Sequence, residues 1–156
     1  MTDAVRAAPN DRFGLVADIG GTNARFALVD PDAPAPAPLH PQTLRNADFA
    51  GLQHAAAHYL QSLGVQPRRA AIAVASPVDA DEIRLTNRAW SFSRSGLRDA
   101  LGLEELRLIN DFGAVAWAVP ALGADDWITL HGAHAAPLRG PVTVLGPGTG
   151  LGVALL

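Results

Sequence analysis

The chain has 156 residues, of which 49% are apolar and 17% charged, so it can form one domain with a core, or one and a half small ones, and is not a disordered segment. With a formal charge of −3, the chain lacks the excess of positive charge that is typical of proteins binding nucleic acid or an anionic membrane. All 12 basic residues are arginine and cysteine is absent, which excludes Walker A, Schiff-base, thiol-nucleophile and cysteine–zinc chemistry. With no signal peptide or membrane helix visible, we expect a soluble, cytoplasmic protein.

The first third of the chain predicts a β-hairpin followed by a proline-rich loop. Apolar runs at residues 13–18 and 24–29 flank Gly20 and Gly21, a pattern typical of two strands joined by a tight turn. Residues 30–41 contain five prolines and favour a stiff surface loop between strands, with an SH3-type ligand as the alternative.

The middle of the chain predicts helices alternating with strands. Asp48 is the candidate cap of an amphipathic helix that runs to Leu63 and is followed by Gly64. Further elements are expected as buried strands at residues 70–75 and 106–109, a short strand at 82–86, and a helix from Ser93 to Leu101 ended by Gly102.

The last third predicts an apolar helix and three strands. Residues 112–119 are apolar on every side, which is typical of a helix packed inside a molecule. The strands are expected at residues 127–130, 142–145 and 153–156. A strand that finished at Leu156 would leave an apolar edge unpaired, so we expect the front part of a longer molecule. A mini-domain whose last strand pairs in a homodimer is the alternative.

The first candidate site is the sequence DIGGTNAR at residues 18–25. Its glycine pair allows backbone N–H groups to approach an anion closely, and Thr22 and Asn23 add side-chain donors. Asp18, at the end of the incoming strand, is suited to hold Mg²⁺ beside phosphate groups. The spacing is not a Rossmann fingerprint, and a plain hairpin turn is the alternative.

The second candidate site is the glycine-rich sequence GPGTGLG at residues 146–152. Alternate glycines around Thr149 suit a backbone nest for phosphate or a close contact with a sugar. A simple glycine-rich turn is the alternative.

The third candidate site is Asn110-Asp111, between a buried strand and an apolar helix. A carboxylate at the end of a strand, at the mouth of an α/β sheet, is suited to ligand binding and proton transfer. A helix cap is the alternative.

The fourth candidate site is LTNRAW at residues 85–90. Polar side chains beside Trp90 can line a sugar pocket, in which the ring covers apolar faces and an amide binds hydroxyl groups. An ordinary turn with a core tryptophan is the alternative.

Taken in this order, the four motifs resemble the bacterial glucokinase family of the actin/hexokinase ATPase superfamily. The DIGGTNAR loop, as opposed to a DIGGTK-like loop, points to the glucokinase branch and not to the related repressor/kinase branch. The similarity covers residues 13–29 (the family's first phosphate loop), 72–92 (a segment near the sugar), 106–120 (the catalytic segment) and 144–154 (the second glycine-rich loop).

The resemblance implies a ribonuclease H-like, actin/hexokinase-type α/β fold with two lobes. Residues 1–12 would be a flexible N-terminus, residues 13–109 a small mixed-sheet lobe, and residues 110–156 the beginning of a larger lobe. The implied activity is ATP-dependent phosphorylation of glucose at its 6-hydroxyl, with Mg²⁺, in the cleft between the lobes.

The resemblance also implies roles for single residues. Asp111 would be the general base that takes the proton of the sugar 6-hydroxyl, with Asn110 and Asn87 binding the sugar and Asp18 positioning Mg²⁺. The ATP phosphates would be cradled by Ala17, Asp18, Ile19, Gly20, Gly21, Thr22 and Asn23. Gly148 and Thr149 would lie close to the sugar or the phosphates.

Part of the family's site has no counterpart in this sequence. Its other sugar ligands, its adenosine-binding segment and its C-terminal helix follow the second glycine-rich loop, so we expect residues 1–156 alone to be inactive. Two other functions stay open: a non-catalytic sugar- or nucleotide-binding regulatory module, and a kinase of the same superfamily for another substrate.

Overall fold

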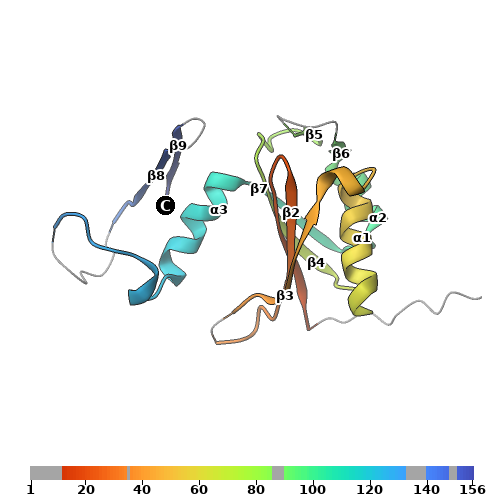
Figure 1. The fold of residues 1–156 in the computed structure, drawn as a ribbon, viewed down its shortest axis with the longest axis horizontal. Coiled ribbons are helices and arrows are strands. Elements are labelled where there is room, and N and C mark those ends of the chain that lie inside the picture. Colours follow the sequence, from red (N-terminus) through yellow and green to blue (C-terminus); the bar gives the residue numbers. More distant parts are fainter. Residues whose placement is uncertain (1–11, 35, 86–89, 133–139, 148–150) are drawn as a thin grey trace, which may run out of the picture. The chain divides into compact units, whose positions relative to one another are not determined.

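The computed structural model describes residues 12–34, 36–85, 90–132, 140–147 and 151–156. By its internal contacts the chain divides into two compact units, Met1–Asn110 and Asp111–Leu156, each of which is described by itself (Figure 1). The expected flexible N-terminus, residues 1–12, falls outside the described residues except for Arg12.

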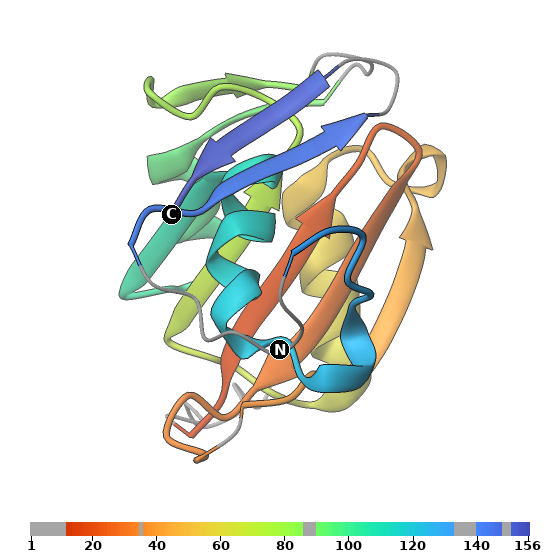
Figure 2. The same cartoon turned by 90° about the vertical axis from the view of Figure 1, so that its left-hand side faces the viewer.

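The first unit is built on a five-stranded sheet in the order β3-β2-β1-β4-β7 (Figures 1 and 2). Its strands are β1 (Gly14–Ile19), β2 (Asn23–Val29), β3 (Leu39–Arg45), β4 (Arg69–Val74) and β7 (Glu105–Asn110). The β1–β2 and β2–β3 pairs are antiparallel, whereas β1–β4 and β4–β7 are parallel. The sheet is therefore mixed, and the predicted hairpin and both predicted buried strands are present in it.

The edge strand β3 occupies the end of the segment that we expected to be a proline-rich loop. Its pairing with β2 shifts register between Phe26 and Leu28, and His40 there has a positive φ of 50°. Pro41 lacks a backbone N–H, and an edge strand with a bulge is where a sheet tolerates proline. The prediction of a loop up to residue 41 was therefore wrong from Leu39 onward.

Helix α1 (Leu52–Leu63) begins later than predicted. Its N-cap is Gly51, and Asp48 belongs to the preceding 3₁₀ turn η1 (Asn46–Asp48). The capping role predicted for Asp48 was therefore wrong, because the chain turns once more before the helix starts. The predicted end is confirmed: Gly64 adopts the left-handed conformation, with φ 66°, which glycine tolerates best.

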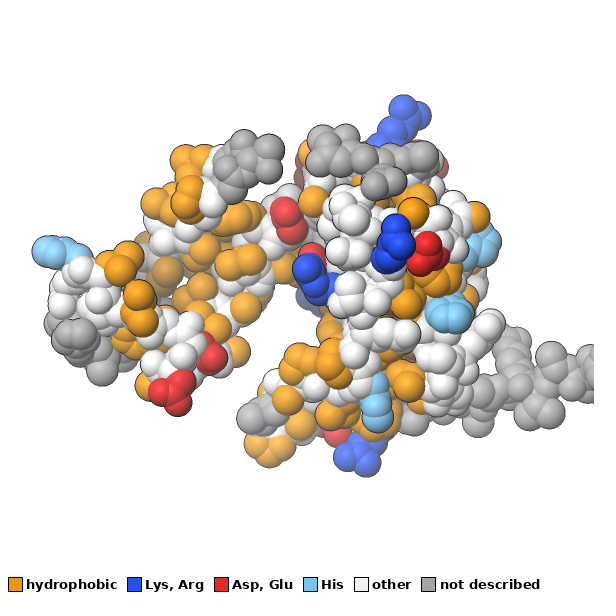
Figure 3. Space-filling view, in the orientation of Figure 1, with side chains coloured by type: hydrophobic (Ala, Val, Ile, Leu, Met, Phe, Trp, Pro, Cys, Tyr) orange, Lys and Arg blue, Asp and Glu red, His pale blue; other side chains and the backbone are white. Residues whose placement is uncertain are grey.

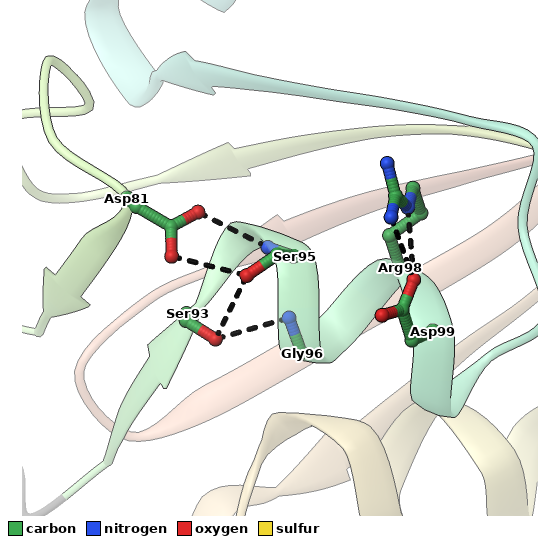
Figure 4. Close-up of polar contacts among 6 residues, drawn as sticks. All are labelled: Asp81, Ser93, Ser95, Gly96, Arg98 and Asp99. Carbon is green, nitrogen blue, oxygen red and sulfur yellow. Dashed lines mark hydrogen bonds and ion pairs between the residues drawn. The ribbon is translucent and has the colours of Figure 1, made fainter.

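Helix α2 (Arg94–Ala100) follows the short hairpin of β5 (Glu82–Arg84) and β6 (Ser91–Ser93). Ser93 caps the helix, since its Oγ accepts the N–H of Gly96 at 3.0 Å. Asp81 accepts both the N–H and the Oγ–H of Ser95 at 3.1 Å (Figure 4). These bonds satisfy donors that the first helical turn otherwise leaves unpaired.

The core of the first unit lies between the sheet and the helices α1 and α2, which contact one another. Phe26 of β2 stacks on Tyr59 of α1 with ring centroids 5.5 Å apart. The Tyr59 hydroxyl donates to the backbone carbonyl of His40 at 2.9 Å, so it stays paired although the side chain is fully buried. Trp90 is also buried and donates to the carbonyl of Phe49 at 3.2 Å.

The second unit contains α3 (Asp111–Ala118), two 3₁₀ turns, η2 (Val119–Ala121) and η3 (Ala124–Asp126), and a hairpin of β8 (Thr143–Pro147) and β9 (Leu151–Leu155). The expected interior helix instead leaves Trp117 73% exposed within the described chain. The strand predicted at residues 127–130 was wrong: Ile128 and Leu130 lie exposed in irregular backbone, because an apolar run becomes a strand only where it finds a pairing partner.

Apolar side chains cover much of the visible surface of the second unit (Figure 3). None of the helices in the described part of the chain combines the length and the apolar character needed to span a membrane.

Candidate functional site

The parallel pairing of the sheet brings two of the predicted sites to one edge of the first unit. Ile19 at the end of β1 pairs with Val74 at the end of β4, and Val74 in turn pairs with Asn110 at the end of β7. The glycine turn that follows β1 and the amide of Asn110 are therefore two strands apart, at the edge of the sheet that is formed by the carboxyl ends of these parallel strands. Ligands of open α/β sheets bind at this edge.

The turn between β1 and β2 has an open form. The N–H of Gly20 donates to the carbonyl of Asn23 at 3.0 Å, and residues 21–22 bend without forming a hydrogen-bonded turn. Thr22 is exposed, while Gly20, Gly21 and Asn23 are half-buried. Backbone N–H groups in such a turn can line a concave site for an anion.

Asp18 lies on the face of the sheet opposite the helices. It pairs across the hairpin with Arg25, whose Nη1 donates to Asp18 Oδ2 at 2.8 Å, and the two side chains are 50% and 61% exposed. An exposed ion pair of this kind is weak and opens readily. The Asp18 carboxylate is thus held at the turn yet remains accessible to a cation.

Asp18 is the residue of this turn that could hold Mg²⁺. In nucleotide sites Mg²⁺ is bound by one or two carboxylates together with phosphate oxygens and waters. The described residues contain no group of three His, Cys, Asp or Glu side chains that could enclose a metal ion. One half-exposed carboxylate beside a turn of backbone donors therefore fits a cation that arrives with a polyphosphate, and it does not fit a closed protein cage.

Asn110 and Asp111 lie on either side of the boundary between β7 and α3. The Nδ2 of Asn110 donates to the carbonyl of Ser76 at 3.4 Å. Asp111 is the first residue of α3, and its Oδ1 accepts the N–H of Phe112 at 2.8 Å. A helix cap was the alternative role that we gave for Asp111. The hydrogen bond from the N–H of Phe112 engages only one carboxylate oxygen, so it does not exclude the catalytic role.

Ser76 is a buried polar residue that the sequence reasoning did not select. Its Oγ donates to the carbonyl of Arg84 at 2.6 Å, and its own carbonyl accepts the amide of Asn110. Ser76 thereby connects the segment after β4 to β5 and to the end of β7. A lone serine after a strand carries no signal that distinguishes it from a surface serine.

Asn46 is the second buried polar residue that was missed. Its backbone N–H donates to the carbonyl of Thr22 and its side-chain Nδ2 to the carbonyl of Gly20, both at 2.9 Å. It follows β3, a strand that we did not predict, so nothing in the sequence placed it beside the glycine turn.

The second glycine-rich loop is described only at its two ends. Gly146 of β8 pairs with Gly152 of β9, and both lie against the ring of Phe112. Gly148 and Thr149 lie outside the described residues, as does Asn87 of the fourth motif. Trp90 of that motif packs in the core, which favours its alternative reading as a core tryptophan.

The family profile and the curated relatives of the chain identify the same family. The sequence profile of the family described as Glucokinase matches residues 15–156. The glucokinase of Stenotrophomonas maltophilia (strain R551-3) is 47% identical over an alignment of 146 residues, and the match covers 89% of this chain and 43% of that protein.

Two crystal structures of glucokinases resemble the fold. The glucokinase from an Antarctic psychrotroph has a TM-score of 0.85 at 41% identity, and the match covers 94% of this chain and 47% of that one. The Balamuthia mandrillaris glucokinase, solved in complex with glucose, has a TM-score of 0.70 at 25% identity, covering 93% and 44% of the two chains. These likenesses confirm the predicted α/β fold class.

The chain spans less than half the length of the relatives it matches. Within the chain, however, the family profile extends from the second residue of β1 to the last residue. It includes both the glycine turn and Asn110-Asp111. The chain belongs to the glucokinase family.

Proposed function

We propose that the complete protein transfers the γ-phosphoryl group of ATP to the 6-hydroxyl of glucose. The observation that carries this proposal is the register Ile19–Val74–Asn110, which brings the glycine turn and the Asn110 amide to one edge of the sheet. Family membership supports it, and so does the glucose bound in the Balamuthia mandrillaris relative.

In this proposal the two units have different roles. The first unit, the small lobe, holds the nucleotide phosphates at residues 17–23, and the second begins the larger lobe at Asp111. The boundary between Asn110 and Asp111 supports this division. Asn87, Gly148 and Thr149 complete the proposed contacts to the sugar and the phosphates.

The phosphate site relies on backbone donors, because the chain contains no lysine. N–H groups of the glycine turn would bind the phosphate oxygens, and the Asp18 carboxylate would hold Mg²⁺. When bound, the metal ion supplies charge neutralisation for the phosphates during transfer. Fixed donors of this kind stabilise developing charge without reorganising during the reaction.

Asp111 is the proposed general base. Its Oδ1 is engaged by the N–H of Phe112, which orients the carboxylate and leaves Oδ2 to accept the proton of the sugar 6-hydroxyl. As that proton transfers, the hydroxyl oxygen forms a bond to the γ-phosphorus. The bond between the γ-phosphorus and its bridging oxygen breaks, and ADP leaves with the electron pair. Asn110 would orient the sugar by a hydrogen bond to a neighbouring hydroxyl.

The test compares D111N with wild type in the complete natural protein. D111N keeps the size of the side chain and removes the base, so kcat should fall about 10²- to 10⁴-fold while binding of Mg²⁺ and the ATP analogue AMPPNP persists. D32N is the matched control: Asp32 is an exposed carboxylate after β2, at the opposite edge of the sheet, and its loss should leave kcat unchanged.

The outcomes separate the functions considered. A D111N protein with wild-type turnover would refute the assignment of the base. A complete wild-type protein that binds glucose or AMPPNP and shows no turnover would instead be the binding module, and faster turnover of another hexose would identify a related kinase. We assign the activity to the cytoplasm, where ATP is the phosphoryl donor. A homodimer was the alternative considered for the last strand, and light scattering of the protein in solution tests for it.

A further inference from the structure

Asn46 is unusual among the residues near the sheet edge because it is polar and almost fully buried. It is the first residue of η1, directly after β3, and only 2% of it is exposed. The residues of β3 itself are almost all exposed. A buried amide at the end of an exposed edge strand is maintained by specific contacts and not by the general burial of its element.

Both donors of Asn46 bind the carbonyls of the glycine turn. The backbone N–H donates to Thr22 and the side-chain Nδ2 to Gly20, each at 2.9 Å (Figure 1 shows this segment beside the β1–β2 turn). In a closed two-residue hairpin, the carbonyl of Gly20 would accept the N–H of Asn23. Here that carbonyl accepts the side chain of Asn46, so the side chain holds the turn in its open form.

The direction of these bonds decides where the turn's N–H groups point. In a trans peptide the carbonyl and the following N–H point in opposite directions, and no cis peptide occurs among the described residues. A Gly20 carbonyl fixed toward Asn46 therefore directs the N–H of Gly21 away from Asn46. By the same rule, the bond to the Thr22 carbonyl orients the N–H of Asn23.

The remaining polar atom of the Asn46 side chain shows that this arrangement lowers the stability of the fold. Asn46 Oδ1 is buried and has no hydrogen-bond partner among the described residues. An unpaired buried acceptor destabilises a fold, and an apolar residue would avoid it. Local departures of this kind concentrate at functional sites.

We infer that Asn46 is a positioning residue of the phosphate site: it fixes the carbonyls of Gly20 and Thr22 so that the N–H groups of the turn face the nucleotide phosphates. This inference rests on the proposed function, in which residues 17–23 bind those phosphates. Asn46 itself does not contact the nucleotide.

The experiment uses the complete protein with two variants and a matched control. N46D keeps the shape of the side chain and removes its donor, and N46A removes the donor without adding charge. Q66E is the control, because Gln66 Nε2 likewise donates to a backbone carbonyl, that of Leu101, at 2.6 Å. Gln66 precedes β4 and so lies at the opposite edge of the sheet.

Two measurements distinguish positioning from a purely structural role. In both Asn46 variants the KM for ATP should rise about tenfold while the KM for glucose stays within about twofold, since one positioning hydrogen bond is lost. Hydrogen exchange in a peptide covering residues 20–23 should become about tenfold faster, with α1 unchanged. Q66E should lower the melting temperature without either effect.

The results that would overturn the inference are specific. An unchanged KM for ATP in N46A, with a raised value in N46D, would show charge repulsion and not positioning. An equal rise in both KM values, or faster exchange throughout the first unit, would show a structural role only. N46S keeps a side-chain donor and should give a smaller rise; it replaces the other variants in the comparison if they do not fold.

Failure of the proposed function would look different. If the complete wild-type protein binds Mg²⁺ and AMPPNP but does not phosphorylate glucose, the proposed reaction fails. The Asn46 inference is then judged by the affinity for AMPPNP and by hydrogen exchange. If the wild type turns over glucose normally and N46A equals it in both KM values, the inference fails alone. If AMPPNP does not bind the wild type, the phosphate site and the inference fail together.

Discussion

Replacing Gly152 by alanine should destabilise the second unit, because the ring of Phe112 occupies the space that a Cβ would need. A Cβ built on Gly152 lies 2.2, 2.3 and 2.6 Å from three carbons of that ring. Carbon atoms in contact are normally about 3.5–4.0 Å apart, so the ring would have to move by more than about 1 Å. Gly146, which pairs with Gly152, lies against the same ring, since a Cβ built there would be 2.2 Å from it.

Two opposing effects set the magnitude. Forcing a carbon into a filled site costs about 1–3 kcal/mol, and the severe overlap places G152A at the upper end. Replacing glycine by alanine also restricts the unfolded chain, which stabilises by about 0.4–1 kcal/mol. The net loss should therefore be about 2 kcal/mol. G14A is the control: the Cβ on this β1 glycine would make only ordinary contacts, at 3.6 and 3.7 Å, so it should be neutral or slightly stabilising.

The assay is urea unfolding of the complete protein, followed by hydrogen exchange in the β8–β9 hairpin so that the second unit is observed directly. Leucine at position 112 lacks the far edge of the ring, so G152A/F112L should lose less stability than the sum of the two single variants. The coupling should be about 1 kcal/mol or more. Displacing Phe112 also moves the N–H that Asp111 accepts, so kcat of G152A should fall about tenfold or more.

Two results would refute this reasoning. A G152A protein as stable as wild type would show that the hairpin and α3 can separate freely. Strict additivity with F112L would show that the loss arises from something other than the ring.

Y59F should lose about 1 kcal/mol at pH 7 in urea unfolding, because the hydrogen bond from the Tyr59 hydroxyl to the His40 carbonyl is lost. Burial raises the pKa of Tyr59 above its usual value of 10.0, so the folded state keeps this proton longer than the unfolded state. The free energy of unfolding of the wild type should therefore fall as pH rises above 10, and its difference from that of Y59F should become smaller. A difference that stays constant with pH would contradict the raised pKa of Tyr59. S93A should cost about 1 kcal/mol through the lost cap of α2. S91A removes the hydroxyl of an exposed residue of β6 and should be neutral; equal losses of stability in the two variants would exclude capping as the cause.

Sequence reasoning succeeded where the signal was local. The β1–β2 hairpin follows from two apolar runs around a glycine pair, and the end of α1 follows from Gly64 after an amphipathic stripe. Each of these features is decided by residues a few positions apart. Propensity and periodicity therefore contained enough information.

Sequence reasoning failed where pairing with a distant segment decides the structure. β3 is polar and contains Pro41, yet it is a strand because β2 offers it a free edge. Residues 127–130 have the opposite character, an apolar run that pairs with no strand in the described chain. Strand formation depends on partners that a local window does not contain.

The same limit applies to the candidate site. Asp18 and Asn110 could be selected because each directly follows or ends a predicted strand, where ligands bind in α/β sheets. Asn46 could not be selected, because its proximity to the glycine turn depends on β3. A residue that supports a site from an unpredicted element becomes visible only when the pairing is known.

The register of β1 joins the stability of the first unit to the position of its site. Side chains alternate along a strand, so the pairing that buries Leu15 and Ile19 also places Asp18 on the opposite face, across from Arg25. A slip of one residue would exchange the two faces. It would bury the Asp18 carboxylate and expose the apolar side chains, both of which are costly. The core therefore enforces the accessibility of Asp18 to a cation, and a sequence change elsewhere that preserves this register also keeps the Asp18 carboxylate on the exposed face.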